Sequence, residues 1–254
     1  MVGKLIFNLR RFQLNSNTLL EIKNVSVNFQ GLKAIDSVNE KILPHEIMGL
    51  IGPNGAGKTT LVNVITGFQS PSEGTVSLNG NITSTNSSFQ LRRKGVSRTF
   101  QGGRLFREMS VCENVEVAGL GLGLSRKKAT EEALELINWI GLSEKANILA
   151  GALPYTDERR VGIARALMQS PKFVLLDEPA AGMSDLECED LMKLVVDIKD
   201  KFGCGVLLIE HNMRVVMQVS ERIHVLDTGK TIARGTPDEI QKNPAVIEAY
   251  LGKS

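Results

Sequence analysis

The sequence predicts an α/β protein built on a mostly parallel, doubly wound sheet, with a small antiparallel sheet beside it. Three observations carry this prediction. The continuous apolar runs at 173–177 and 205–209 are typical of strands buried on both faces. A helical pattern at 185–201 separates them, as a right-handed crossover between parallel strands requires. A third apolar run, 46–51, leads into a glycine-rich turn and another helical pattern, and this alternation of strand and helix defines the class.

The first part of the chain is predicted to consist mostly of strands. Residues 1–18 are expected to form an N-terminal extension without clear periodicity, which is either disordered or adds one strand. Apolar alternation then predicts strands at 19–29, 38–43 and 46–51 and a hairpin element at 75–82. The last of these turns back at Asn79-Gly80, a pair that favours a tight hairpin. We expect these early strands to form a small antiparallel sheet.

A mostly helical subdomain is predicted at about residues 102–156, inserted into one domain that spans 19–254. A helix at 87–94 and a short strand ending at Phe100 precede it. Inside it, a Ser110–Glu113 capping box opens a helix, and a flexible break is expected at Gly119–Gly123. A second helix at 130–140 ends at Gly141, and its residues on one face are Ala133, Leu134, Ile137 and Ile140.

The second part of the chain returns to alternating helices and strands. Besides the three segments already given, the predicted elements are helices at 157–169 and after 209, strands at 223–226 and 231–233, and one or two short helices at 237–251.

Composition excludes several classes of protein. The chain of 254 residues is 42% hydrophobic and 23% charged, with a net charge of +2, which argues against broad nucleic-acid binding. Its three cysteines, without a C-x-x-C pair, suit reduced thiols in a cytosolic protein. No apolar run approaches the length of a membrane span, so any action at a membrane needs spans supplied by another chain.

The glycine-rich turn has the pattern of a phosphate-binding loop, G-x-x-x-x-G-K-[ST]. It consists of Gly52, Pro53, Asn54, Gly55, Ala56, Gly57, Lys58, Thr59 and Thr60. Glycines let backbone N–H groups close around phosphate oxygens, and the following helix directs its positive end at the same anion. Lys58 is predicted to reach the β- and γ-phosphates, and Thr59 to help hold Mg²⁺.

Hydrolysis of a bound nucleotide needs a second acidic site, and Asp177-Glu178 follows the apolar run 173–177. We predict that Asp177 holds Mg²⁺ through water and that Glu178 polarises the attacking water. Taken alone, two carboxylates at a strand end could equally be an exposed acidic loop.

The order of motifs from about Leu19 to Gly252 resembles the ATP-binding subunits of ABC transporters, P-loop NTPases with an ABC-type ATPase core. The stations in order are Phe29, the phosphate loop, Thr99-Phe100-Gln101, a signature-like segment, Leu175-Leu176-Asp177-Glu178-Pro179 and Glu210-His211. Within the family the chain is most similar to the branched-chain amino acid importers, on strings such as 97–101, 104–109, 180–183 and 243–251.

The resemblance implies further roles. Phe29 would stack on adenine, although a strand-end core aromatic is the alternative. Gln101 would contact Mg²⁺ or the catalytic water and couple the site to the membrane subunit, and His211 would donate a hydrogen bond to the γ-phosphate. His45 and His224 have no such placement and are expected to be surface or structural residues.

The largest departure from the family is its signature, Leu-Ser-Gly-Gly-Gln, which here is Leu153, Pro154, Tyr155, Thr156 and Asp157. In the family this loop contacts the γ-phosphate bound by the opposite subunit. Pro154 has neither a hydroxyl nor an N–H, Thr156 puts a branched side chain where glycine gives room, and Asp157 would repel phosphate. These changes predict an asymmetric dimer in which the composite site using this segment turns over slowly.

We therefore expect an ATP-hydrolysing, Mg²⁺-dependent subunit of an importer for branched-chain or related amino acids. The implied partners are a second ABC ATPase subunit, transmembrane permease subunits and, indirectly, a periplasmic or extracellular solute-binding protein, with no nucleic acid. The implied location is peripheral, on the cytoplasmic face of the membrane. The alternatives are the ATPase of a lipid or lipopolysaccharide exporter, a non-transport ABC ATPase, and a catalytically idle nucleotide-binding partner.

Overall fold

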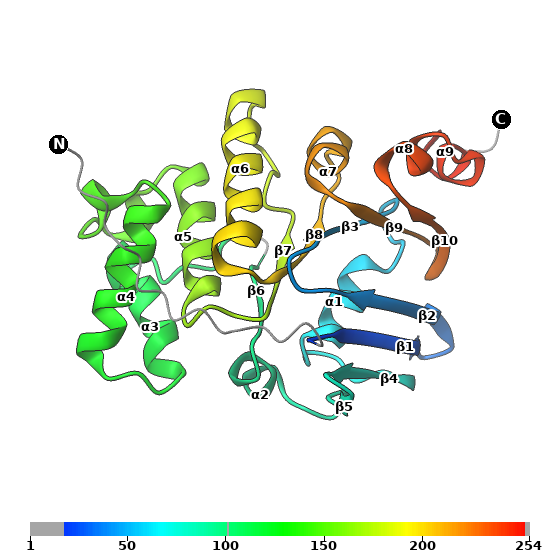
Figure 1. Cartoon of the computed structure of the whole chain (residues 1–254), viewed down its shortest axis with the longest axis horizontal. Coiled ribbons are helices and arrows are strands. Elements are labelled where there is room, and N and C mark those ends of the chain that lie inside the picture. The colour runs from blue at the N-terminus through cyan, green and yellow to red at the C-terminus, as the bar shows by residue number, and fades with distance from the viewer. Residues whose placement is uncertain (1–17, 101, 252–254) are drawn as a thin grey trace. The chain divides into compact units, whose positions relative to one another are not determined.

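The computed structural model describes residues 18–100 and 102–251, and these fall into two compact units (Figure 1). One unit comprises residues 102–171, and the other comprises the described residues before 102 and after 171. The predicted extension at 1–18 lies outside the described residues apart from Thr18, as does Gln101. The predicted domain boundaries stay a prediction.

The larger unit contains a six-stranded sheet in the order β10-β9-β3-β8-β7-β6. Its strands are β3 (Ile47–Ile51), β6 (Val96–Arg98), β7 (Phe173–Asp177), β8 (Gly205–Ile209), β9 (Arg222–Asp227) and β10 (Lys230–Gly235). Neighbouring strands are parallel except β10, which is antiparallel to β9. Every residue of β3, β7 and β8 is buried, which is why these strands are continuous apolar runs.

A four-stranded antiparallel sheet in the order β2-β1-β4-β5 confirms the expected small sheet. It consists of β1 (Leu20–Phe29), β2 (Leu32–Ile42), β4 (Glu73–Leu78) and β5 (Asn81–Ile82). The hairpin at Asn79-Gly80 is confirmed, with positive φ at both residues. β2 begins six residues before the predicted Val38, because Gln30-Gly31 also has positive φ at both positions and closes a second tight hairpin with β1. The strand at 46–51 was grouped with this sheet by prediction, but it is β3, at the centre of the parallel sheet.

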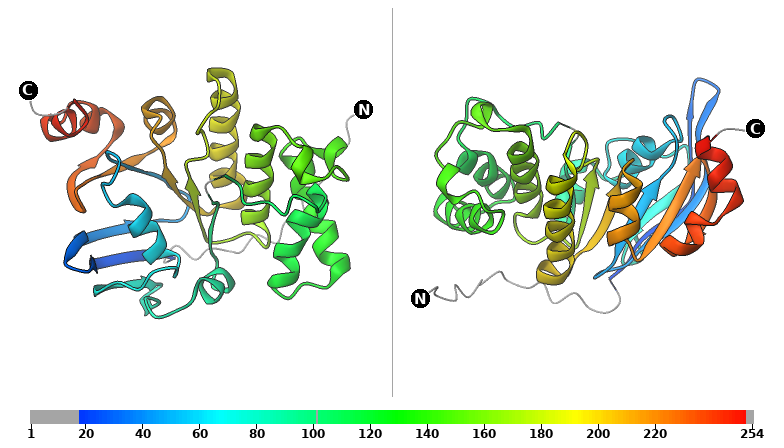
Figure 2. Two further views of the ribbon diagram at one scale, coloured as in Figure 1. Left: turned by 180° about the vertical axis from the view of Figure 1, so that it is seen from behind. Right: turned by 90° about the horizontal axis from the view of Figure 1, so that it is seen from above.

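Helix α1 (Lys58–Ile65) lies between the two sheets (Figures 1 and 2). Its apolar residues belong to one buried cluster together with residues of β1, β2, β4, β7 and β8. A second cluster joins β3, β9 and β10 to the C-terminal helices. Because the apolar residues of α1 pack with strands of both sheets, the helix that follows the glycine-rich turn is held in place by both sheets.

The remaining helices of this unit agree with the predicted pattern. They are α2 (Ser88–Arg93), α6 (Asp185–Asp197) continued by a π-helical turn (Ile198–Phe202), α7 (Met213–Val219), α8 (Pro237–Gln241) and α9 (Pro244–Leu251). Gly203, with φ +69, ends the α6 segment as expected.

The smaller unit is helical, with α3 (Val111–Gly121), α4 (Arg126–Trp139), α5 (Tyr155–Leu167) and two short 3-10 turns, Ser143–Lys145 and Ala150–Ala152. Ser110 and Glu113 form the predicted capping box. The break predicted at Gly119–Gly123 is wrong in its start, because α3 continues to Gly121. A Cβ at Gly119 would lie 2.5 Å from the Met168 side chain, so this glycine serves close packing inside a helix.

Helix α4 begins four residues before the predicted Thr130, because Ser125 caps it. Its buried face consists of Ala129, Ala133, Leu136 and Ile137. Leu134, which was assigned to that face, is 47% exposed. These four residues follow the spacing of one helix face, i, i+4, i+7 and i+8, and Leu134 lies off that face.

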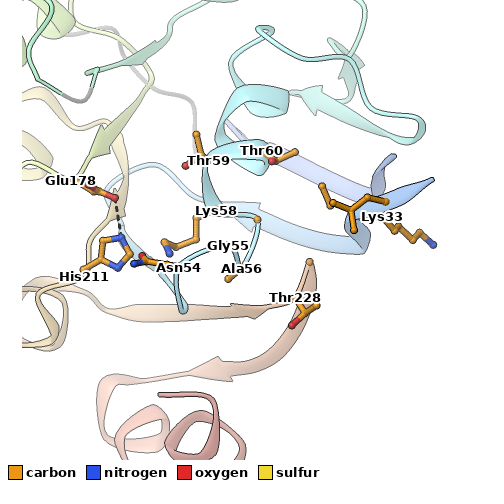
Figure 3. A pocket seen from close by; sticks show the side chains of 14 residues that line it. Lys33, Asn54, Gly55, Ala56, Lys58, Thr59, Thr60, Glu178, His211 and Thr228 are labelled. Carbon is orange, nitrogen blue, oxygen red and sulfur yellow. Dashed lines mark hydrogen bonds and ion pairs between the residues drawn. The ribbon is translucent and has the colours of Figure 1, made fainter. Parts of the chain in front are cut away.

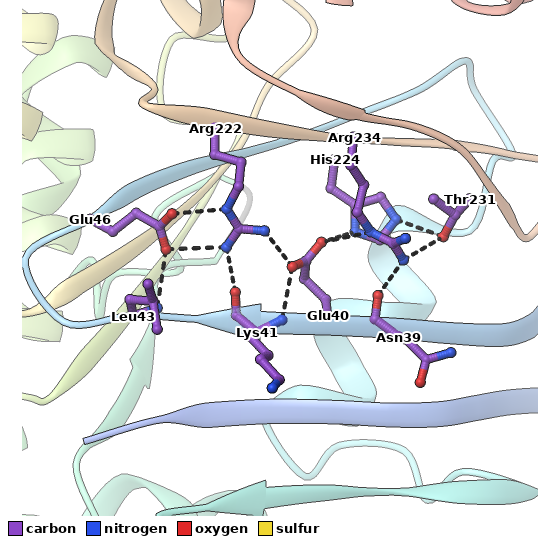
Figure 4. Close-up of polar contacts among 9 residues, drawn as sticks. All are labelled: Asn39, Glu40, Lys41, Leu43, Glu46, Arg222, His224, Thr231 and Arg234. Carbon is purple, nitrogen blue, oxygen red and sulfur yellow. Dashed lines mark hydrogen bonds and ion pairs between the residues drawn. The ribbon is translucent and has the colours of Figure 1, made fainter. Parts of the chain in front are cut away.

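β2 is joined to β9 and β10 by a cluster of charged side chains centred on the buried Glu40 (Figure 4). Its Oε1 accepts from Arg222 Nη1 at 2.5 Å and from the Lys41 N–H at 2.8 Å. Its Oε2 lies 2.8 Å from His224 Nδ1 and 3.2 Å from Arg234 Nε. His224 is fully buried, which confirms the structural role expected of it.

Candidate functional site

The glycine-rich turn runs from the end of β3 to the first residue of α1, and two of its glycines are required by geometry. Gly52 has φ +152, and a Cβ there would lie 2.0 Å from the Leu226 carbonyl oxygen. Gly57 has φ +99, and a Cβ there would lie 2.7 Å from the Ala34 carbonyl oxygen. No other residue type allows both the conformation and the approach.

Lys58 is 6% exposed, and its ammonium group donates to the carbonyls of Gly52 at 2.7 Å and Pro53 at 3.0 Å. Burial lowers the pKa of Lys58, and the carboxylates of Glu178 and Asp177 act against this shift. Helix α1 has no side-chain cap and no acidic residue in its first turn. Its N–H groups and the cation beside them therefore suit an anion such as a phosphate.

These groups surround a cavity of about 300 Å³ (Figure 3). Its lining consists of Leu32, Lys33, Ala34, Asn54, Gly55, Ala56, Gly57, Lys58, Thr59, Thr60, Glu178, His211, Thr228 and Gly229. The structure thus brings Asn54–Thr60 together with Glu178 and His211. Phe29, the candidate for adenine stacking, is 45% exposed and is not in this lining.

Two parts of the lining were missed by the sequence analysis. Leu32–Ala34 lie at the start of β2, and Thr228-Gly229 form the turn between β9 and β10. The Gly229 N–H donates to the Ala56 carbonyl at 3.0 Å, and the Asp36 N–H donates to the Gly229 carbonyl at 2.9 Å. The turn reaches the loop because β9 pairs with β3, and the start of β2 reaches it through the hydrogen bond between Asp36 and Gly229. No local pattern in the sequence encodes either neighbour relation.

Glu178 and His211 face each other at the carboxyl ends of adjacent strands, with His211 Nε2 2.9 Å from Glu178 Oε1. The register of β7 and β8 places Asp177 opposite Ile209, and the Glu178 N–H donates to the Ile209 carbonyl at 2.8 Å. Glu178 has φ +49, a left-handed conformation that costs free energy for a residue with a side chain.

Glu210 holds the backbone on either side of this pair, a role that the sequence did not predict. Its side chain accepts from the Ala180 N–H at 2.5 Å and from the His211 N–H at 3.0 Å. Burial raises the pKa of Glu210, and the backbone donors oppose that shift. The carboxylate thereby ties the turn after Glu178 to the residue that carries the imidazole.

Asp177 lies at the end of β7 and is 7% exposed. Its Oδ2 is 2.8 Å from Arg98 Nη2, and its N–H donates to Thr99 Oγ1 at 3.0 Å. Thr59, another predicted magnesium ligand, is exposed on the cavity, and the third, Gln101, lies outside the described residues. Hydroxyl and carboxylate oxygens are suitable donors for Mg²⁺, which is usually held by few protein ligands together with phosphates.

The signature-like segment lies in the helical unit, at the start of α5. Pro154 is the N-cap of α5, and Tyr155, Thr156 and Asp157 form its first turn, while Leu153 is buried. Asp157 is paired with Lys145 at 2.5 Å. The aspartate charge expected to repel phosphate is thus partly neutralised inside its own unit.

Fold and site together define a P-loop ATPase: a cavity of about 300 Å³ at the carboxyl edge of a mostly parallel sheet, with a glycine-rich loop, a lysine and a carboxylate–histidine pair around it. The ABC transporter family model matches residues 35–181, and the model described as "Branched-chain amino acid ATP-binding cassette transporter" matches residues 230–254. The chain belongs to the ABC transporter family of ATP-binding subunits and is an ABC-type ATPase.

One relative and two solved structures document this similarity. The high-affinity branched-chain amino acid transport ATP-binding protein LivG of Escherichia coli K12 is 44% identical, over 94% of this chain and 100% of the relative. A nucleotide-free ATP-binding cassette from an ABC transporter superposes with a TM-score of 0.85 at 30% identity, covering 93% of this chain and 100% of that chain. A dimeric cassette bound to ADP and Pi superposes with a TM-score of 0.78 at 27% identity, covering 86% of this chain and 98% of that chain.

Proposed function

We propose that this chain is the ATPase of an importer for branched-chain or related amino acids. The observation that carries the cargo class is the match of residues 230–254 to the branched-chain cassette model, together with 44% identity to LivG. The match of residues 230–254 also favours an importer over a lipid or lipopolysaccharide exporter. Among the described residues no helix is long and apolar enough to cross a bilayer, so transmembrane permease partners would supply the path.

The residues of the cavity support a division of labour in hydrolysis. Lys58 and the N-terminal amides of α1 bind the β- and γ-phosphates, and Glu178 orients the attacking water. His211, 2.9 Å from Glu178, donates to the γ-phosphate once nucleotide competes for it. Thr59 would hold Mg²⁺ directly and Asp177 would hold it through water, and the bound ion would supply positive charge against the phosphates. Gln101 stays a predicted participant, since it lies outside the described residues.

Two such subunits would sandwich two ATP molecules, closing on binding and opening on hydrolysis against the permeases. A dimeric cassette among the similar structures supports this arrangement. The chain would work peripherally, on the cytoplasmic face of the membrane, with a solute-binding protein delivering cargo on the other side.

Uptake into proteoliposomes containing the assembled transporter tests the proposal. We expect ATP-dependent accumulation of labelled leucine, isoleucine or valine when the matching solute-binding protein is present. ATP hydrolysis without uptake of any of the three would refute the cargo class and leave the ATPase assignment intact.

The signature-like segment supports the asymmetric dimer as a second part of the proposal. Pro154 offers no hydroxyl to the partner's nucleotide, and Thr156 replaces the glycine that allows close approach. In the assembled transporter Thr156→Gly should raise turnover, because it gives the slow composite site more room. Unchanged turnover would mean that Thr156 is not the limiting element.

A further inference from the structure

Arg98 occupies the end of the edge strand β6, next to β7, and its side chain is only 8% exposed. One arm of its guanidinium group, Nη2, lies 2.8 Å from Asp177 Oδ2. The other arm, Nη1, donates to Asn63 Oδ1 at 2.7 Å and to Thr66 Oγ1 at 3.3 Å. Arg98 therefore binds both the strand that ends in Asp177 and the helix that begins at Lys58.

Further contacts fix the orientation of this guanidinium group. It lies 5.4 Å from the ring centre of Phe68 and 4.9 Å from that of Phe100. The two rings meet edge to face, with their centres 5.6 Å apart. Nε of Arg98 donates to the Thr99 carbonyl at 3.3 Å. A planar guanidinium group held by these contacts has little freedom to move. The position of Arg98 therefore determines where the Asp177 carboxylate lies.

Arg98 occupies only one of the two carboxylate oxygens of Asp177. Among the residues that the structure describes, no hydrogen bond or ion pair reaches Asp177 Oδ1. The backbone of Asp177 is held as well, since its N–H donates to Thr99 Oγ1. This carboxylate is thus oriented by Oδ2 and by its backbone, while Oδ1 stays available.

We propose that Arg98 is a positioning residue for Mg²⁺: it fixes the distance between the Thr59 hydroxyl and the Asp177 carboxylate. These two oxygen donors come from different elements, α1 and β7, and Arg98 contacts both elements directly. The inference rests on the proposed function, which gives both donors to the metal. Mg²⁺ demands near-ideal octahedral geometry and usually keeps several waters, so a displaced Thr59 hydroxyl, or a displaced Asp177 carboxylate that no longer orients a bound water, reduces its affinity.

The test separates metal binding from nucleotide binding in the purified chain. Binding of a fluorescent ATP analogue is titrated in EDTA and again with rising Mg²⁺, for the wild type, Arg98→Met, Arg98→Lys and Asn63→Ala. Mn²⁺ binding to the nucleotide complex, followed by electron paramagnetic resonance, gives a direct reading of the metal. Arg234→Met is the matched control, because Arg234 also holds a buried carboxylate, that of Glu40, away from the cavity.

We expect affinity in EDTA to stay within about twofold of the wild type, while half-saturating Mg²⁺ rises by about tenfold or more in Arg98→Met, as for other residues that orient metal ligands. Arg98→Lys should give a smaller rise, because an ammonium keeps the charge but loses the fork. Asn63→Ala should also raise half-saturating Mg²⁺, since it removes the shorter of the two hydrogen bonds from Arg98 to the α1 segment and leaves the bond to Asp177. Arg234→Met should leave the Mg²⁺ response unchanged.

The inference is overturned if folded Arg98→Met has the Mg²⁺ response of the wild type, or if it loses affinity equally with and without Mg²⁺. Should Arg98→Met fail to fold, Arg98→Lys and Asn63→Ala decide the question in the same way. A wild type whose nucleotide binding ignores Mg²⁺ would instead overturn the proposed magnesium site itself.

Discussion

Two buried carboxylates of the larger unit each have an arginine partner, yet they differ in how completely they are satisfied. Glu40 receives Arg222 and Lys41 at one oxygen and His224 and Arg234 at the other (Figure 4). Asp177 meets Arg98 at one oxygen, and the other has no partner among the described residues.

The difference distinguishes a structural cluster from a reactive site. A buried carboxylate with every lone pair engaged is stable as it is and has no capacity for a ligand. One that is oriented but only half engaged keeps an acceptor for something not yet bound. The two regions also differ in backbone geometry. At the cavity, Glu178, the residue after Asp177, has a left-handed φ of +49, whereas Glu40 in the cluster has no positive φ.

The largest expected effect is on chemistry at the site. Glu178→Gln keeps the size of the side chain but removes the group that polarises water, so turnover should fall by about a thousandfold. Nucleotide should still bind and trap a closed dimer, because the phosphate loop is unchanged. ATPase assays and size-exclusion chromatography with ATP measure both results. Wild-type turnover in this variant would remove Glu178 from the mechanism.

The matched change in the cluster should affect stability instead. Glu40→Ala removes the buried acceptor shared by the fully buried His224 and the partly exposed Arg222 and Arg234, and breaking a buried charged group in this way costs about 3 kcal/mol of unfolding free energy. Urea denaturation measures the loss, while the ATPase rate per folded molecule at low temperature should stay near that of the wild type. A stable variant with impaired turnover would reverse the assignments of the two regions.

The cluster should also make stability depend on pH. Burial lowers the pKa of His224 below its ordinary 6.5, so the fold prefers the neutral imidazole and loses stability as the pH falls below that value. The pKa of Glu40 is lowered from 4.5 to about 2: burial alone would raise it, but His224, Arg222 and the Lys41 N–H stabilise the charged form. This second contribution is present above pH 4.5 and is lost as the pH falls towards 2.

Melting temperatures measured from about pH 8 down to about pH 2 should therefore decline from about pH 6.5 downward, and more steeply below pH 4.5. Glu40→Gln, which lacks the titrating carboxylate, should lose the steep part below pH 4.5. A flat profile in the wild type would show that neither group is coupled to folding.

The same contrast explains what the sequence could predict. The phosphate loop is contiguous, and Glu178 and His211 each follow an apolar run that matches β7 or β8 residue for residue. The sequence could therefore name these residues, but it did not predict their contact. Thr228 lines the cavity only because β9 is the neighbour of β3, and Arg98 matters only through side chains on α1 and β7. Contacts that depend on strand order leave no local pattern. The hairpin turn at Gln30-Gly31 was not predicted for another reason: glutamine is not a usual residue at such a turn.

The smallest expected effect tests the backbone at the site. At Glu178, with φ +49, glycine avoids the steric cost that any L-residue with a side chain bears in the left-handed region, about 1 kcal/mol. Glu178→Gly should therefore be more stable than Glu178→Ala by about that amount, although both are inactive. In β2, at Glu40, the order should reverse, because glycine in a strand interior destabilises relative to alanine by about 0.5–1 kcal/mol. Thermal denaturation of the four variants measures both differences. If glycine is the more stable variant at Glu178 and alanine the more stable one at Glu40, the backbone is strained at the site and not in the cluster. If alanine is more stable at both positions, the backbone at Glu178 is not strained.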